Sequence, residues 1–264
     1  MKNFSSSSLY SLCLVSLLGS AHAASIDLNF GSVDKQTELN NDGTMSFTAP
    51  IANDGTTDIY ALIVAETSYT QGGSGGSGSA ADDVKINQAP NTTTNFTLTL
   101  YQNEELTEVY DPGVSFSYDL FFYDIDGHNT EGDKYYDIVT VYTPSVVTYT
   151  TTTELTITNN ADGSVTASGI NTNGVPGQDG LTSFNQAQAD VAASFTFTDT
   201  ASVNFDYTIV NNYNSGQRNL LIDGGNLTFG TFDTDTTTVT AVPEPSSTML
   251  LGLGSLALIL RRRK

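Results

Sequence analysis

The sequence predicts an all-β protein, an antiparallel β-sandwich of the jelly-roll type, and three observations lead to this fold class. Apolar and polar residues alternate with period two in several segments, which is typical of strands with one buried face. Short stretches rich in Gly, Asn and Asp separate these segments and favour tight turns. A hydrophobic content of 38%, with 13 Tyr and 13 Phe among 264 residues, supplies the side chains for a core.

The alternation is clearest in residues 96–100, 114–122 and 203–209, where every second residue is aliphatic or aromatic. In residues 114–122 the apolar set alternates with Ser115, Ser117, Asp119 and, as an exception, Phe121. Further along, residues 155–158 and 164–167 flank an Asn/Asp/Gly turn and predict a hairpin, while residues 199–202 and 223–226 predict two more turns. Residues 181–193 are the only candidate helix.

We expect one β-sandwich domain over residues 24–233, followed by a Thr-rich spacer at 234–241. Residues 143–153 contain Pro144 and a run of Thr, so they are either a linker between two sandwiches or an edge strand. A single domain is favoured, because Val146, Val147 and Tyr149 lie within this stretch and suit a strand.

The N-terminal 23 residues have the three parts of a secretory signal peptide. Lys2 precedes a mostly apolar run at 9–18, and Ala21 and Ala23 form the small-x-small pattern of a cleavage site. Cleavage after Ala23 removes Cys13, the only cysteine of the chain. The mature protein is therefore expected to have neither disulfides nor thiolate chemistry.

The C-terminus combines a proline-rich motif, a short apolar segment and a basic end. Pro243, Glu244 and Pro245 precede a predicted transmembrane segment at 248–260, and the chain ends with Arg-Arg-Arg-Lys at 261–264. A helix over this segment spans about 20 Å, which is shorter than a hydrocarbon core of about 30 Å. Basic residues hold their end of a segment in the cytoplasm. The order therefore predicts a transient insertion into the membrane rather than a permanent anchor.

These three parts, over residues 242–264, resemble the PEP-CTERM sorting signal of Gram-negative bacteria. The resemblance implies an exported protein with a transient inner-membrane stage, processed by an exosortase near Pro243, Glu244 and Pro245. Bacteria with this system typically make extracellular polysaccharide, which makes a polysaccharide or biofilm partner an expectation. The resemblance covers the tail alone and implies nothing about the fold or ligand of the body.

The net charge of −20 opposes binding to nucleic acid or to an anionic membrane surface. Between residues 24 and 242 the imbalance is larger, because 28 acidic residues face only Lys35, Lys85, Lys134 and Arg218. Divalent cations are the natural partners of such a body.

A dense acidic stretch at 124–133 directly follows the predicted strand at 114–122. Ca²⁺ takes six to eight oxygen ligands, and alternate acids at a strand end aim two carboxylates into one loop. The spacing does not match an EF-hand, and a solvated hairpin loop is the alternative interpretation. The candidate calcium ligands are Asp124, Asp126, Asn129, Glu131 and Asp133.

The sequence contains no recognisable catalytic set, since His128 is the only histidine after the signal peptide and Trp is absent. A non-enzymatic surface or extracellular-matrix protein, sorted by an exosortase, is therefore the favoured function. The alternative is a calcium-dependent carbohydrate-binding module, and a weaker alternative is an extracellular polysaccharide-active enzyme, which needs two carboxylates facing each other in a cleft. Candidate sugar-stacking residues, unless they belong to the core, are Tyr118, Tyr123, Tyr135 and Tyr136.

Overall fold

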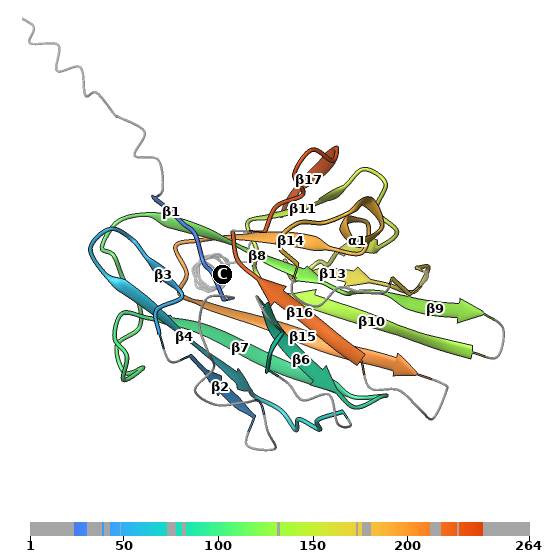
Figure 1. Cartoon of the computed structure of the whole chain (residues 1–264), viewed down its shortest axis with the longest axis horizontal. Coiled ribbons are helices and arrows are strands. Elements are labelled where there is room, and N and C mark those ends of the chain that lie inside the picture. The colour runs from blue at the N-terminus through green and yellow to red at the C-terminus, as the bar shows by residue number, and fades with distance from the viewer. Residues whose placement is uncertain are drawn as a thin grey trace, which may run out of the picture.

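The structure is a computed structural model, in which two β-sheets pack against each other around one core (Figure 1). It describes residues 24–30, 39, 43–47, 49–72, 78–80, 83–130, 133–172, 174–175, 181–211, 218–225 and 227–239. The predicted signal peptide at 1–23 and the predicted sorting tail at 242–264 lie outside the described residues.

The first sheet has eight strands, and all of its pairs are antiparallel except β1 with β8. Its strands are β1 (Ala24–Ile26), β5 (Gly78–Ala80), β6 (Asp83–Gln88), β8 (Phe116–Tyr123), β11 (Val146–Thr150), β14 (Ala193–Thr198), β16 (Arg218–Asp223) and β17 (Thr234–Thr238). Their spatial order is β17-β11-β14-β8-β16-β6-β5. Strands β1 and β16 share one edge of β8, because β1 pairs with its first half and β16 with its second.

The second sheet has nine strands and is antiparallel throughout. Its strands are β2 (Thr44–Ser46), β3 (Ala52–Asn53), β4 (Asp58–Ala65), β7 (Thr93–Tyr101), β9 (Gly127–Thr130), β10 (Asp133–Val141), β12 (Thr156–Asn159), β13 (Val165–Ser168) and β15 (Ser202–Asn211). The order is β12-β13-β10-β15-β7-β4-β2, with β3 beside β4 and β9 beside β10.

The core between the sheets consists of the alternate apolar residues of the central strands. Phe122 of β8 packs edge to face on Phe205 of β15 with 5.2 Å between ring centroids, and Phe205 stacks on Phe96 of β7 at 5.3 Å. All three rings are fully buried. The prediction of an all-β fold is confirmed, with two mostly antiparallel sheets, and the three alternating segments supply β7, β8 and β15.

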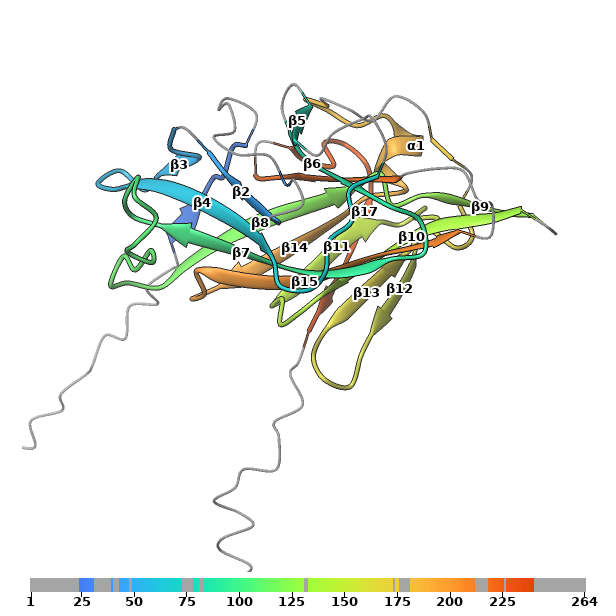
Figure 2. The same ribbon diagram turned by 90° about the horizontal axis from the view of Figure 1, so that it is seen from below.

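A second apolar cluster lies on the outer face of the first sheet, and we call it the outer aromatic layer. Its members are Phe121, Tyr123, Phe184, Ala189, Ala192, Leu221, Leu227 and Phe229. Phe184 lies just before helix α1 (Gln186–Ala189), which is capped by the side chain of Asn185. The helix lies on the side of the molecule opposite the β12–β13 hairpin (Figure 2). The candidate helix at 181–193 therefore contains one short turn of helix, which positions a loop over the sheet.

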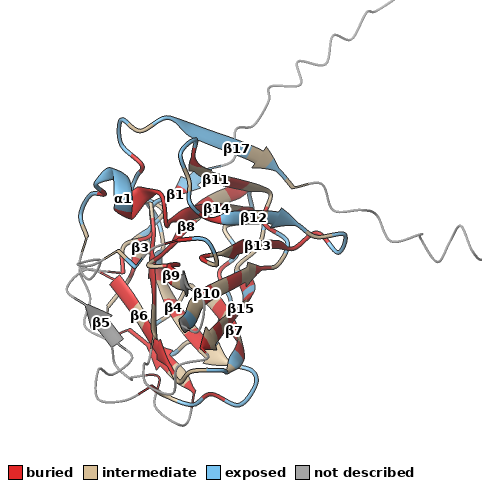
Figure 3. Cartoon of the chain, turned by 90° about the vertical axis from the view of Figure 1, so that its right-hand side faces the viewer, coloured by how far each residue is buried: buried red, intermediate tan, exposed pale blue. Residues whose placement is uncertain are grey.

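Two stretches that the sequence leaves open as linker or spacer, residues 143–153 and 234–241, each contribute a strand to the first sheet. Residues 143–153 contain β11, which lies between β14 and β17 in the first sheet. The Thr-rich residues 234–241, expected to be a spacer, contribute their first five residues to β17, which is almost entirely exposed (Figure 3). The turn expected at 223–226 follows β16, and Leu227 and Phe229 beyond it pack in the outer aromatic layer.

Candidate functional site

The predicted acidic loop lies at the end of β8 and folds into the β9–β10 hairpin. Asp124 follows β8 directly and has a φ of 63°, a left-handed conformation that turns the chain. Strand β9 then pairs with β10 from Gly127 opposite Tyr136 to Thr130 opposite Asp133. A side chain at position 127 would collide with Tyr136, because a Cβ there would lie 2.4 Å from the Cβ of Tyr136. Glycine is thus required for this close approach of the two strands.

The five predicted calcium ligands have different surroundings in this hairpin. Asp126 is buried, Asp124 is half-buried, and Asn129 and Asp133 lie in the paired strands β9 and β10. Glu131 and the side chains of Asn129 and Asp133 lie outside what the structure describes. Within the described residues, no group of three or more His, Cys, Asp or Glu side chains is arranged to hold a metal ion. Calcium binding by this loop stays a prediction.

Asp126 takes part in a buried ion-pair network around Arg218, which we call the Arg218 centre. Arg218 begins β16 and donates from Nε and Nη2 to Oδ2 of Asp137 in β10, at 2.9 and 2.7 Å. Its Nη2 also donates to Oδ1 of Asp126. On the far side, the hydroxyl of Tyr207 in β15 donates to Oδ1 of Asp137 at 2.9 Å. The amide of Val175 donates to Oδ2 of Asp126 at 2.6 Å, so the loop before α1 joins the same network.

Burial determines the electrostatics of the Arg218 centre. Asp137 is completely buried, and this burial raises its pKa to about 6, although the charge of Arg218 acts in the opposite direction. The side chain of Arg218 is itself only 17% exposed. Burial favours the neutral form of Arg218, but the carboxylates of Asp137 and Asp126 outweigh it and raise the pKa of Arg218. The cation therefore stays charged and holds two carboxylates that water does not reach.

The Arg218 centre links the two sheets, and Arg218 also contacts the aromatic ring of Tyr135. Arg218 belongs to the first sheet, whereas Asp137 and Tyr207 belong to the second. The guanidinium carbon lies 5.1 Å from the ring centroid of Tyr135, within cation–π range. The imidazole of His128 stacks on the same ring at 5.6 Å with an interplanar angle of 27°. Asp137 and Asp126 both pair with Arg218, and Asp126 also accepts from the N–H of Val175. The arrangement therefore stabilises the contact between the sheets. The sequence carries one signal for it: Arg218 is the only arginine between residues 24 and 242.

The tyrosines proposed for sugar stacking divide into two groups. Tyr118 and Tyr123 are 1% and 0% exposed and therefore belong to the interior, as the alternative interpretation held. Tyr135 and Tyr136 are half-buried. The ring of Tyr135 already packs against His128 and Arg218.

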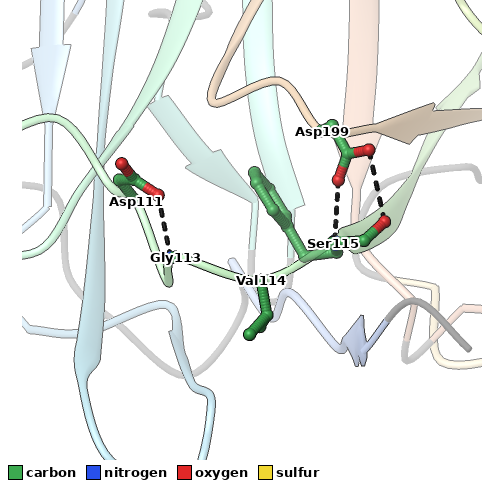
Figure 4. Close-up of a pocket in the computed structure, with 6 residues that line it drawn as sticks. Asp111, Gly113, Val114, Ser115 and Asp199 are labelled. Carbon is green, nitrogen blue, oxygen red and sulfur yellow. Dashed lines mark hydrogen bonds between the residues drawn. The ribbon is translucent and has the colours of Figure 1, made fainter. Parts of the chain in front are cut away.

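A shallow pocket of about 430 Å³ lies at the opposite end of β8, next to Val114 and Phe116 (Figure 4). It contains two carboxylates, which is the composition that a glycosidase requires. However, Asp199 accepts hydrogen bonds from the amide of Phe116 and the hydroxyl of Ser115, at 2.9 and 3.2 Å. Asp111 accepts one from the amide of Gly113 at 2.8 Å. Asp111 thus stabilises a local turn, whereas Asp199 joins the end of β14 to the start of β8.

The comparisons with known proteins identify the C-terminal tail. Residues 241–264 match the family model of the PEP-CTERM protein-sorting motif. No curated protein matches the chain. A solved structure, the adhesin domain of PrgB from Enterococcus faecalis, is similar with a TM-score of 0.42 and 16% identity. The match covers 70% of this chain and 63% of that one.

The class of protein is therefore a two-sheet β domain followed by a C-terminal sorting signal. The chain carries the PEP-CTERM motif, as the sequence predicted, and the motif implies export and sorting by an exosortase. Pro243, Glu244 and Pro245 fall within the matched residues. Ala21 and Ala23 of the predicted signal cleavage site, and the predicted membrane segment at 248–260, lie outside the described residues. Among the residues that are described, no helix is long and apolar enough to cross a membrane.

Proposed function

We propose that this chain is a non-enzymatic protein of the cell surface or extracellular matrix in a Gram-negative bacterium. In this proposal the signal peptide starts export, and the segment at 248–260 holds the chain transiently in the inner membrane. An exosortase then processes the tail, and the β domain associates with extracellular polysaccharide. The observation that carries the proposal is the PEP-CTERM motif at residues 241–264, which begins two residues after Val239, the last described residue.

The β domain supports a binding role more than a catalytic one. Asp126 and Asp137 pair with Arg218 near one end of β8, and Asp199 accepts hydrogen bonds from the start of β8 at the other end. Both arrangements stabilise the fold. The strongly acidic surface favours solubility outside the cell and opposes binding to polyanions.

Cell fractionation tests the sorting part of the proposal. We compare the full chain with a chain truncated after Ala241 and with a triple Ala variant of Pro243, Glu244 and Pro245. Both variants should lose the location of the full chain, because the motif presented to the exosortase is missing. A matched triple Ala variant at Thr234, Asp235 and Thr236 in β17 controls for changes near the tail. An unchanged location of both tail variants would contradict the proposal.

Calcium-dependent carbohydrate binding is a second, separate proposal for the acidic hairpin. Asp126 already accepts from Arg218 and from the amide of Val175, so an ion would depend mainly on Asp124, Asn129, Glu131 and Asp133. The test is thermal unfolding of the purified protein in Ca²⁺ and in EDTA. A bound ion raises the midpoint by mass action, and equal midpoints would remove calcium from the proposal.

A further inference from the structure

The outer face of the second sheet carries a regular row of polar side chains on β7 and β15, which we call the polar ladder. Its rungs are four cross-strand hydrogen-bonded pairs: Thr93–Thr208 at 2.9 Å, Asn95–Asp206 at 2.8 Å, Thr97–Asn204 at 2.8 Å and Thr99–Ser202 at 3.1 Å. All eight side chains are exposed or half-exposed. The strands lie about 4.8 Å apart and the rungs about 6.8 Å apart, as in any antiparallel sheet.

The ladder presents hydrogen-bonding groups that are already ordered. A hydroxyl has one proton and two lone pairs, so when two Thr hydroxyls share one hydrogen bond, one proton and several lone pairs still point to solvent. The β-branched Thr side chains are stiff at χ1, and the cross-strand bonds fix them further. A ligand that binds here orders few additional rotamers, which reduces the entropic cost of binding.

The ladder is nearly neutral in a strongly acidic protein. Asp206 is its only charged residue, although acids outnumber bases by 29 to 9 in the whole chain. Its carboxylate accepts from Nδ2 of Asn95 on one oxygen and from the hydroxyl of Tyr142 on the other, at 2.8 and 2.7 Å. A cation therefore finds little free charge on the ladder itself, and an anion is repelled by the rest of the protein. A neutral ligand rich in hydroxyl groups matches the ladder.

An aromatic pair continues the ladder at one end. Tyr101 is the next outward residue of β7 after Thr99, and it pairs across the strands with Tyr60 of β4. Both rings are half-exposed. A Tyr ring offers an apolar face with a polar tip, which suits the apolar C–H face of a sugar ring whose hydroxyls reach the neighbouring rungs. The order of groups along β7 thus fits one chain of linked sugars lying parallel to the strand.

We propose that the polar ladder, with Tyr60 and Tyr101, is a binding site for a neutral polysaccharide. The site gives the polysaccharide association of the proposed function a place on the molecule and rests on that function. It lies on a different element from the acidic hairpin, and its hydrogen bonds require no calcium.

The test is affinity electrophoresis of the purified, exported full chain in gels that contain neutral glucans, mannans or galactans. Gels with alginate, an anionic glycan, and gels without glycan are run alongside. We expect retardation by at least one neutral glycan and none by alginate, with EDTA present throughout. The double variant Thr97→Val with Thr99→Val and the single variant Tyr101→Ala should each bind about tenfold more weakly. Tyr101→Phe should keep most of the affinity, because the ring remains.

The matched control is Thr234→Val with Thr236→Val on β17, the same change two residues apart on exposed Thr of the first sheet. Its affinity should equal that of the unaltered chain, and the thermal midpoint of every variant is measured to check folding. Binding to no neutral glycan, stronger binding to alginate, or an equal loss in the control would overturn the proposal. So would a change from dimer to monomer in the ladder variants, since the face would then serve self-association. These results leave the sorting proposal standing, because it fails only if the tail variants keep their location.

Discussion

The outer faces of the two sheets have the same backbone pattern and opposite surroundings. On the first sheet, Phe121, Tyr123 and Leu221 point outward and are covered by the loop that carries Phe184 and α1. On the second sheet, the outward residues of β7 and β15 are Thr, Asn, Ser and Asp, and they bond to one another across the strands. Period-two alternation therefore locates a core, whereas the identity of the residues between the apolar ones shows whether the other face of the sheet is covered.

The largest change in stability is expected from the Arg218 centre, which joins the two sheets between these outer faces. Arg218→Met leaves Asp126 and Asp137 buried without their cation, and we expect the free energy of unfolding to fall by about 3–5 kcal/mol. Lys134→Met, which removes one exposed positive charge from β10, the strand that also carries Asp137, should change it by less than about 0.5 kcal/mol. Urea unfolding of both variants measures the two values, and similar losses would mean that the Arg218 centre does not join the sheets.

The next largest change in stability is expected in the outer aromatic layer, which covers the first sheet. Phe184→Ala removes a ring that packs 5.6 Å from Tyr123 and 5.9 Å from Phe229. We expect a loss of about 3 kcal/mol in the free energy of unfolding, from lost burial and the cavity that remains. The comparison partner is Thr99→Ala on the open face, where a loss below about 1 kcal/mol is expected. An equal loss of unfolding free energy in the two variants would contradict the view that one outer face is covered and the other is open.

A smaller, pH-dependent effect is expected from Asp137. Its pKa is raised from 3.8 to about 6 by burial, so between these values the folded protein keeps a proton that the unfolded chain releases. Stability from this group is therefore fully present below pH 3.8 and is lost as pH rises through about 6. The difference between pKa 3.8 and about 6 corresponds to about 3 kcal/mol, at about 1.4 kcal/mol per pKa unit, and roughly 2 kcal/mol of this stability is lost between pH 4 and pH 7.

This effect is measured as the difference in unfolding free energy between pH 4 and pH 7, in the unaltered chain and in Asp137→Asn. Acids with lowered pKa, such as Asp162, give the opposite slope in both proteins and cancel in the comparison. An identical pH dependence in the two proteins would show that Asp137 is ionised throughout this range.

The smallest effect concerns the rungs of the ladder. A double-mutant cycle with Thr97→Val and Asn204→Ala should give a coupling energy of about 0.5 kcal/mol, typical of a cross-strand polar pair. Each single variant should keep the midpoint of unfolding within a few degrees. A coupling above about 2 kcal/mol would indicate that the open face contributes to stability as much as the covered one.

The fold class was predictable because its cause is local. Alternation in residues 96–100, 114–122 and 203–209 follows directly from the geometry of a strand, and the central strands form there. Phe121 is the apolar exception among the outward residues of the segment 114–122, and its ring lies in the outer aromatic layer. The composition of residues 234–241 predicts a spacer because nothing in it marks a core-facing side, whereas β17 forms at 234–238 through backbone pairing with β11.

The candidate site was harder to predict because its contacts are far apart in the sequence. The acidic residues from 124 to 133 form one cluster in the sequence, but Asp126 is bound to Arg218, 92 residues later. Likewise the ladder joins Thr93 to Thr208 across 115 positions. Alternation shows that Thr97 and Thr99 point outward, but only the pairing of β7 with β15 shows which side chains they meet. The sorting motif needed no such information, since a tail is recognised from contiguous residues.

Strand β17 also determines how the protein responds to a pulling force. Among the described residues it is the last strand before the sorting motif, it lies at the edge of the first sheet, and its five residues contribute no side chain to the buried core. A load applied to the chain beyond Val239 reaches the sandwich first through the hydrogen bonds between β17 and β11. Detaching this strand would lengthen the tail by about 17 Å and leave the core between the sheets in place. The edge strand can thus act as a small extensible element between the body and whatever holds its C-terminal end.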